Sequence, residues 1–288
     1  MSEREKTQLL EYQRNEITEY HLYRRLAAMQ NSPENARILE NIAEDEKRHY
    51  EQWKGYTGED VRPDWAKVRK YCWISRVFGL TFGTKLMERG EAGAQQAYAG
   101  LPAEVVHAGT IAKEEGDHEA ALLAMLDEER LRYVGSVVLG LNDALVELTG
   151  TLAGLTFALQ NTRLIALTGS ITGIAAALSM ACSEYLSTKA EGADQQPLKA
   201  ALYTGAAYVV TVVLLILPFF VFPNFYVSLA CTLLTAVMII ALFNFYISVA
   251  KDLPFKRRFV EMAGLSLGVA ALSFLVGLAL RLFLGVEV

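Results

Sequence analysis

Two stretches of the chain repeat one another: residues 42–49 read IAEDEKRH, and residues 111–118 read IAKEEGDH. The offset between them is 69 residues, and a proline precedes each stretch by the same distance, at Pro33 and at Pro102. Proline is favoured at the first position of a helix. The sequence therefore predicts two helices that begin at these prolines and carry the repeated stretch at the same place.

Both copies contain the pattern Glu-x-x-His, formed by Glu46 with His49 and by Glu115 with His118. Side chains three residues apart lie on one face of a helix. Each helix therefore offers a carboxylate and an imidazole to one site, as in the carboxylate-bridged di-metal centres of four-helix bundles. A third Glu-x-x-His, at residues 104–107, lies outside the repeat register, and we interpret it as a solvent-exposed pair.

Two more carboxylates are expected from the other two helices of such a bundle. Glu16 and Glu91 stand at the same spacing from a following Tyr and Leu, so these segments also repeat one another. We predict that Glu16 and Glu91 are the single-carboxylate ligands. Each has a second Glu one turn away, Glu19 and Glu88, which we consider as alternate or third-site ligands.

The predicted ligands are four carboxylates and two imidazoles: Glu16, Glu46, His49, Glu91, Glu115 and His118. Four carboxylates balance the charge of two divalent cations. Hard oxygen and imidazole ligands suit iron or manganese better than copper, which favours thiolate or thioether. The sequence therefore predicts a di-iron site (Fe²⁺/Fe³⁺), with Mn²⁺ as an alternative occupant.

The helices that carry these ligands are expected at about 5–29, 33–55, between 65 and 98, and 102–132. The longest connection joins the second and third helices, as in ferritin-like folds. The domain resembles the rubrerythrin branch of the ferritin-like superfamily, on the two Glu-x-x-His motifs and the two Glu residues with their Tyr. Rubrerythrins often add an iron domain held by four cysteines. The three isolated cysteines here cannot form one, which weakens a peroxidase assignment.

Residues 65–82, with aromatic rings among basic residues, either extend the third helix or lie on a membrane surface.

Composition divides the chain into two domains, which we place at 1–131 and 132–288. Residues 1–132 hold 19 of the 27 Lys and Arg, 24 of the 32 Asp and Glu, and all four His. The rest of the chain is strongly apolar. The first thirty residues are charged and lack the apolar core of a signal peptide, so the first domain is expected in the cytosol. The net charge of −5 gives no reason to expect a nucleic acid partner.

The second domain contains hydrophobic segments long enough to cross a bilayer, which needs about 20 apolar residues. The five segments are expected at about 134–159, 164–187, 200–222, 226–250 and 262–284. Lys and Arg gather after the second and fourth segments, and basic loops stay in the cytosol. We therefore expect an all-α, multi-pass protein of a prokaryotic-type plasma membrane, with a cytosolic N-terminal domain and an external C-terminus.

Charged residues within a span are costly and indicate function. Asp143 and Glu147 stand four apart in the first segment, and Met180 and Glu184 stand four apart in the second. Carboxylates can carry a partly dehydrated Fe²⁺ or Mn²⁺, or protons, and a thioether favours transition metals. Alternatively, Met180 only packs against neighbouring helices, and Glu184 only reaches the membrane interface.

Residues 140–144 read GLNDA and residues 179–187 read SMACSEYLS. With the five spans, these motifs resemble the vacuolar iron transporter family. The resemblance implies a homodimer that exports Fe²⁺, often also Mn²⁺, in exchange for protons, with Asp143 and Met180 lining the pore. Plant members collect metal in a helical region between spans two and three, whereas this connection is short here. The whole chain resembles the membrane-bound ferritin-like iron exporters, in which a bundle takes over metal collection.

Three functions are compatible with the sequence. The first is a metal exporter fed by the bundle, which the intramembrane residues Asp143 and Met180 favour. The second is a membrane-anchored ferroxidase or peroxidase. The third is a transporter whose bundle only senses metal and gates the pore.

Overall fold

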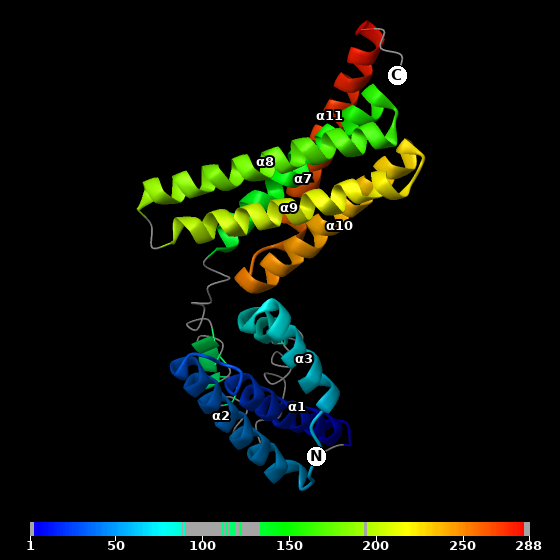
Figure 1. Cartoon of the computed structure of the whole chain (residues 1–288). Helices are drawn as coiled ribbons and strands as arrows, with labels where there is room; N and C mark the ends of the chain where they lie inside the picture. The colour runs from blue at the N-terminus through cyan, green and yellow to red at the C-terminus, as the bar shows by residue number, and fades with distance from the viewer. Residues whose placement is uncertain are drawn as a thin grey trace. The chain divides into compact units, whose positions relative to one another are not determined.

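The computed structural model describes residues 3–87, 89, 111, 113–114, 116–118, 121–122, 133–192 and 195–284. The fold is all-α, as the sequence predicts. The chain forms two compact units, Met1–Glu128 and Glu129–Val288 (Figure 1).

The first unit begins with two antiparallel helices, α1 (Glu3–Ala27) and α2 (Pro33–Thr57). The side chain of Ser32 accepts a hydrogen bond from the backbone N–H of Asn35, which satisfies one of the free donors at the start of α2. Pro33 occupies the first turn, as the repeat predicts. The helix ends at Gly58, whose φ of 69° is a left-handed conformation that glycine adopts without strain.

Large apolar side chains hold α1 and α2 together. Tyr23 and Leu26, the residues that mark the repeated spacing after Glu16, are buried in this core. Trp53 of α2 is fully buried against Tyr12 of α1, with ring centroids 5.9 Å apart. Burying side chains of this size is the main source of helix-pair stability. The Tyr and Leu of the repeat therefore position the carboxylate that precedes them.

The run after residue 64 forms a separate helix, α3 (Trp65–Phe78), which packs against α1. The Asp64 side chain accepts hydrogen bonds from the N–H groups of Ala66 and Lys67 and so begins the helix. The helix stops at Gly79, where φ is 99°, and helical backbone resumes over residues 80–87. The run of aromatic and basic residues at 65–82 is thus interrupted at Gly79. The backbone there adopts a positive φ, which residues with a side chain rarely adopt.

The second unit consists of five long apolar helices: α7 (Val134–Leu159), α8 (Thr162–Glu191), α9 (Pro197–Val221), α10 (Phe225–Lys251) and α11 (Phe255–Leu284). All five are long and apolar enough to cross a membrane. Successive helices run in opposite directions, so the α8–α9 and α10–α11 connections lie at the same end as the start of α7 (Figure 1).

Two helix bounds differ from the expected segments. Helix α8 continues to Glu191, and α11 begins at Phe255, well before residue 262. The basic residues 256–258 therefore belong to the first turn of α11 and not to a loop. Hydropathy detects the apolar middle of a span, whereas the helical backbone extends beyond it into the polar interface.

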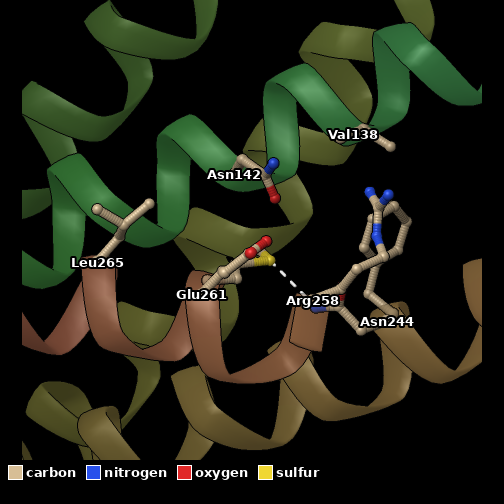
Figure 2. Close-up of a pocket in the computed structure, with 8 residues that line it drawn as sticks. Val138, Asn142, Asn244, Arg258, Glu261 and Leu265 are labelled. Atoms are coloured by element: carbon tan, nitrogen blue, oxygen red, sulfur yellow. Dashed lines mark hydrogen bonds between the residues drawn. The ribbon is translucent and has the colours of Figure 1, made fainter. Parts of the chain in front are cut away.

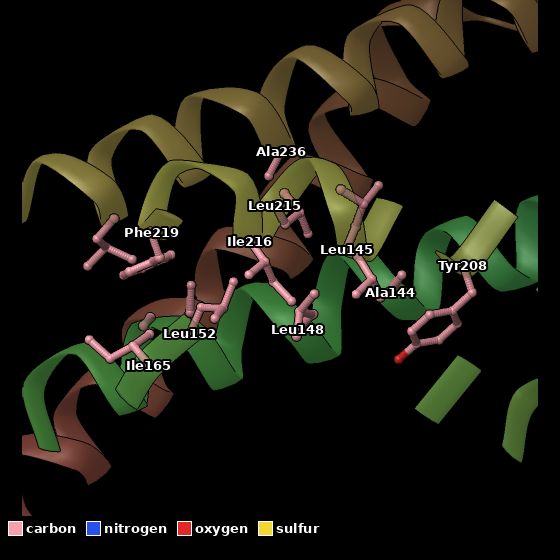
Figure 3. Close-up of a cluster of buried hydrophobic side chains, with 14 of the residues drawn as sticks. Ala144, Leu145, Leu148, Leu152, Ile165, Tyr208, Leu215, Ile216, Phe219 and Ala236 are labelled. Atoms are coloured by element: carbon pink, nitrogen blue, oxygen red, sulfur yellow. The ribbon is translucent and has the colours of Figure 1, made fainter. Parts of the chain in front are cut away.

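The core of the second unit forms around α7 (Figure 3). Leu145, Leu148 and Leu152 of α7 are buried against Leu215 and Ile216 of α9 and other apolar side chains. Gly140 allows α7 to approach α9 closely, since a Cβ at this position would lie 2.3 Å from the carbonyl oxygen of Thr204. Small residues at helix contacts are typical of membrane proteins. Helix α7 is thereby fixed within the unit.

Candidate metal centre and transport path

Three predicted ligands meet inside the first unit. Glu16 of α1 is 3% exposed, and Glu46 and His49 of α2 are 1% and 0% exposed. One ligand atom from each lies within 4.8 Å of the others, a separation that a single metal ion can bridge. Carboxylates are seldom fully buried unless they are paired or bind a metal.

The carboxylate of Glu46 lies between two imidazoles. His49 Nδ1 is 3.5 Å from Glu46 Oε2 and 3.5 Å from Glu16 Oε2. His118 Nδ1 is 3.2 Å from Glu46 Oε1. Each oxygen of Glu46 thus faces a different histidine, as expected of a carboxylate that bridges two ions.

The outer nitrogen of each imidazole contacts a second carboxylate. His49 Nε2 is 2.7 Å from Glu114 Oε2, and His118 Nε2 is 3.1 Å from Asp45 Oδ2. Arg48 donates to both acidic side chains, over 2.5 Å to Asp45 and 3.0 Å to Glu114. A carboxylate on the outer nitrogen places the proton there and leaves Nδ1 able to bind a metal.

Asp45 and Glu114 were not among the predicted site residues, although the repeat contains a signal for them. They are equivalent at the offset of 69 residues, and each directly precedes the Glu of its Glu-x-x-His. Each copy therefore orients the histidine of the other copy. Sequence spacing along one helix could not show this exchange, because it depends on how two helices face each other.

Burial also determines the charge of the cluster. Burial raises the pKa of Glu16 to about 8, and the neighbouring Glu46 carboxylate adds to this rise, whereas His49 opposes it. The other oxygen of Glu16 accepts a hydrogen bond of 2.9 Å from the indole N–H of Trp53. In the metal-free cluster a proton therefore substitutes for part of the charge that a cation would supply.

The described donors fit a hard divalent cation. Within the described part of the chain, Glu46 Oε2 is buried and accepts no hydrogen bond, so it remains free to bind a metal. The donor set of carboxylate oxygens and imidazole nitrogens suits iron or manganese.

The other predicted ligands are placed less fully. Glu19 is buried in α1 one turn after Glu16. Glu88, Glu91 and Glu115 lie outside the described residues, and so does the excluded pair at 104–107. His21, which we did not predict as a ligand, packs its ring 4.7 Å from the ring of Trp65.

In the second unit, the carboxylates of α7 lie on one side of the helix. Asp143 is half-buried, whereas Glu147 is exposed and accepts a hydrogen bond of 3.0 Å from the hydroxyl of Tyr208. Tyr208 is itself fully buried in α9. The hydroxyl of a buried side chain therefore fixes one carboxylate oxygen of Glu147 within the helical unit.

A hydrogen bond sets the register between α7 and α8. The hydroxyl of Ser136 donates to Glu184 Oε1 over 2.6 Å. Because these helices are antiparallel, Met180 lies one turn deeper than Glu184, within about one helical turn of the depth of Asp143. Met180 is half-buried and packs partly against the apolar core.

A cavity of about 260 Å³ opens beside this path, between α7, α10 and α11 (Figure 2). Its lining is Val138, Asn142, Phe243, Asn244, Arg258, Glu261, Met262 and Leu265. Asn142 directly precedes Asp143, and the amide of Asn244 donates to the sulfur of Met262 over 3.2 Å. Sequence reasoning missed Arg258 and Glu261, because the fifth segment was expected to begin after them.

Residues 134–193 match the model of the VIT family. This stretch comprises α7, α8 and the start of the following connection, and it contains the intramembrane residues Asp143, Glu147, Met180 and Glu184. A search of curated proteins gives no match to the chain. The similarity to the VIT family thus lies in the first two of the five apolar helices.

Proposed function

We propose that this chain exports Fe²⁺, and also Mn²⁺, from the cytosol in exchange for protons, and that the Glu and His cluster collects or senses the metal. The observation that carries the proposal is the VIT-matched pair α7–α8. Both helices are long enough to span a membrane, and they hold the carboxylates of Asp143, Glu147 and Glu184 and the thioether of Met180. Ionisable groups are costly in a bilayer, and within spans they typically mark ion or proton pathways.

The side chains of the path suit the proposed cargo. Asp143 and Glu147 can replace part of the water shell of a divalent ion, and the same carboxylates can bind protons in the opposite step. The sulfur of Met180 favours a transition metal over Mg²⁺ or Ca²⁺. The path therefore combines selectivity with a group that can couple metal and proton movement.

The cluster of the first unit would hold the collected metal through Glu16, Glu46, His49 and His118, with Glu91 and Glu115 completing two sites. Asp45 and Glu114 would orient the two imidazoles. Bound iron would supply one-electron redox chemistry. The chain itself supplies a buried, largely anionic environment that binds a cation in place of the Glu16 proton.

We infer the orientation of the chain in the membrane from the placement of basic residues. Lys189 and Lys199 flank the α8–α9 connection, and Lys251 and residues 256–258 flank the α10–α11 connection. Basic ends of spans face the cytosol. The first unit precedes α7 at this same end, so we infer that it receives metal from the cytosol. From the resemblance to the vacuolar iron transporter family, we also infer a homodimer.

Metal flux into proteoliposomes tests the proposal. Asp143→Ala should abolish Fe²⁺ and Mn²⁺ flux without removing metal from the first unit. Cys182→Ser, an exposed change on α8, is the matched control and should transport normally. Unchanged flux in Asp143→Ala would exclude Asp143 from the transport path. A flux that does not change with an imposed pH gradient would exclude proton exchange.

A ferroxidase is the second candidate, favoured by the buried Glu16, Glu46 and His49 cluster. The two functions separate in Asp143→Ala. If the chain is chiefly an enzyme with a membrane anchor, oxygen-dependent Fe²⁺ oxidation by this variant should equal that of the parent chain, and the parent should show no flux. Glu46→Ala should remove any such oxidation.

A further inference from the structure

Helix α3 exposes an unusual set of apolar side chains. Trp73 is 62% exposed, and Trp65, Val77 and Phe78 are 42%, 43% and 41% exposed. Several large apolar side chains exposed on one short helix point to a contact with a partner or a membrane. The cluster of ligands in α1 and α2 makes no use of them.

Apart from Phe78, which follows the buried Ile74 by four residues, these exposed residues lie on one side of the helix. Val68, Tyr71 and Ile74, spaced three apart, are buried and form the side that packs inward. Arg69, Trp73 and Arg76 are spaced four and three apart and are all exposed, so they share the opposite side. We define the α3 surface as Trp65, Arg69, Lys70, Trp73, Arg76 and Val77.

The charge of this region is uniformly positive. Residues 65–87 contain five Lys or Arg and no Asp or Glu, although the whole chain has a net charge of −5. A helix that combines exposed Trp with Lys and Arg is typical of segments that lie in the interface of a bilayer. The aromatic rings prefer the headgroup level, and the cations are attracted to anionic lipids.

The α3 surface is firmly attached to the helix that carries Glu16. The backbone N–H of Asp64 donates to the hydroxyl of Thr18 over 2.9 Å. The guanidinium carbon of Arg25 lies 5.1 Å from the Trp65 ring centroid. Contacts of this kind tie the first turn of α3 to α1, so the orientation of α3 determines the orientation of the metal cluster.

Aromatic contacts also fix the outer end of the surface. The rings of Trp73 and Phe78 meet edge to face at 6.4 Å, and Phe78 lies 5.5 Å from Phe82, which is buried. Trp73 is therefore supported from the interior of the first unit. A supported aromatic ring loses little conformational entropy when it enters another phase.

We propose that the α3 surface docks on the anionic phospholipid surface of the membrane that α7–α11 span. The occupant is lipid: the ring of Trp73 enters the headgroup region, and Arg69, Lys70 and Arg76 contact lipid phosphates. Because both units belong to one chain, docking is intramolecular, and a modest intrinsic affinity suffices. The proposal depends on the membrane helices and not on the identity of the transported ion.

Tryptophan fluorescence of the full chain tests the docking directly. All three Trp residues, Trp53, Trp65 and Trp73, lie in the first unit, so the membrane helices contribute no Trp emission. The chain is reconstituted in phosphatidylcholine nanodiscs that contain phosphatidylglycerol, with or without brominated acyl chains. Bromine should quench about a third of the emission, because Trp73 lies at headgroup level whereas Trp53 is buried and the Trp65 ring packs against His21 and Arg25 of α1. Trp73→Phe should lose most of the quenching.

A charge variant separates lipid docking from other contacts. Arg69→Gln/Lys70→Gln/Arg76→Gln should weaken docking by about fivefold for each charge removed. The matched control Arg14→Gln/Arg37→Gln/Lys47→Gln removes three exposed charges from α1 and α2, and its emission should be quenched as in the parent chain. The parent chain in nanodiscs without phosphatidylglycerol should show the same loss of quenching as the charge variant.

Three results would overturn the proposal. One is equal emission in brominated and unbrominated nanodiscs. Another is quenching that persists in Trp73→Phe or that does not respond to phosphatidylglycerol. A third is a Trp73 emission that changes with protein concentration and not with lipid composition. That result would assign the α3 surface to contact with a second copy of the chain.

Discussion

Asp45 Oδ2 lies 3.1 Å from His118 Nε2, so an acidic residue of one repeat orients the histidine of the other. The reciprocal contact joins Glu114 to His49 over 2.7 Å. These two contacts link the repeats into one unit and leave both Nδ1 atoms facing Glu46. The repeat therefore encodes the support of each ligand as well as the ligands.

Removing this support should weaken metal binding without removing a ligand. We expect Asp45→Asn or Glu114→Gln to lower Fe²⁺ or Mn²⁺ affinity by about 10- to 100-fold, since a neutral amide replaces the anionic acceptor and holds the imidazole less firmly. Competition with a chelator of known affinity measures the change. Glu44→Gln, which removes only an exposed pair with Arg24, is the control. Equal effects of the two changes would assign Asp45 a merely electrostatic role.

Glu46 should contribute to both metal ions, because each of its oxygens faces a different histidine. We therefore expect Glu46→Ala to remove both ions, and combining it with Glu115→Ala should cause no further loss. Metal content per chain, measured by elemental analysis after gel filtration, gives the result. Retention of two ions would show that the ligand set is wrong.

Metal binding should depend on pH through Glu16. Its pKa in the folded, metal-free unit is about 8, compared with an ordinary value of 4.5. Between these values the folded unit keeps a proton that the unfolded chain loses, so the stability of the metal-free unit falls as pH rises through this window. A cation must displace the same proton. Apparent affinity should therefore rise with pH and level off above about pH 8.

Calorimetry in buffers of different ionisation enthalpy measures that proton. Near neutral pH, Mn²⁺ binding should release about one proton from Glu16. Glu16→Gln should abolish this release and flatten the pH dependence. An affinity of the parent chain that is constant from pH 6 to pH 8 would contradict a protonated Glu16.

The helices of the fold were predictable because their signals are local. Pro33 with Ser32 marks the start of α2, and the apolar runs mark five spans. The break at Gly79 and the early start of α11 were missed, because hydropathy and charge do not report backbone conformation. Within the site, the Glu-x-x-His spacing predicted which residues share one face of a single helix. The contacts of Asp45 and Glu114 depend on the mutual rotation of two helices, which no spacing within one helix determines.

The close approach of α7 to α9 gives a prediction on stability and transport together. A methyl group in Gly140→Ala would meet the backbone oxygen of Thr204 at 2.3 Å, and backbone cannot rotate away as a side chain can. The helices must therefore separate, which should cost about 1–3 kcal/mol. Because Gly140 precedes Asp143 by less than one turn, metal flux should fall as well.

Gly264→Ala is the matched control for this change, since a Cβ there meets nothing within 4 Å among the described residues. It should leave both the unfolding temperature in detergent and the Fe²⁺ flux near those of the parent chain. A Gly140→Ala variant with the parent unfolding temperature would mean that α7 and α9 are not in close contact in the membrane. A destabilised variant with full flux would instead separate the packing of α7 from the transport path, because Asp143 would then work from a displaced helix.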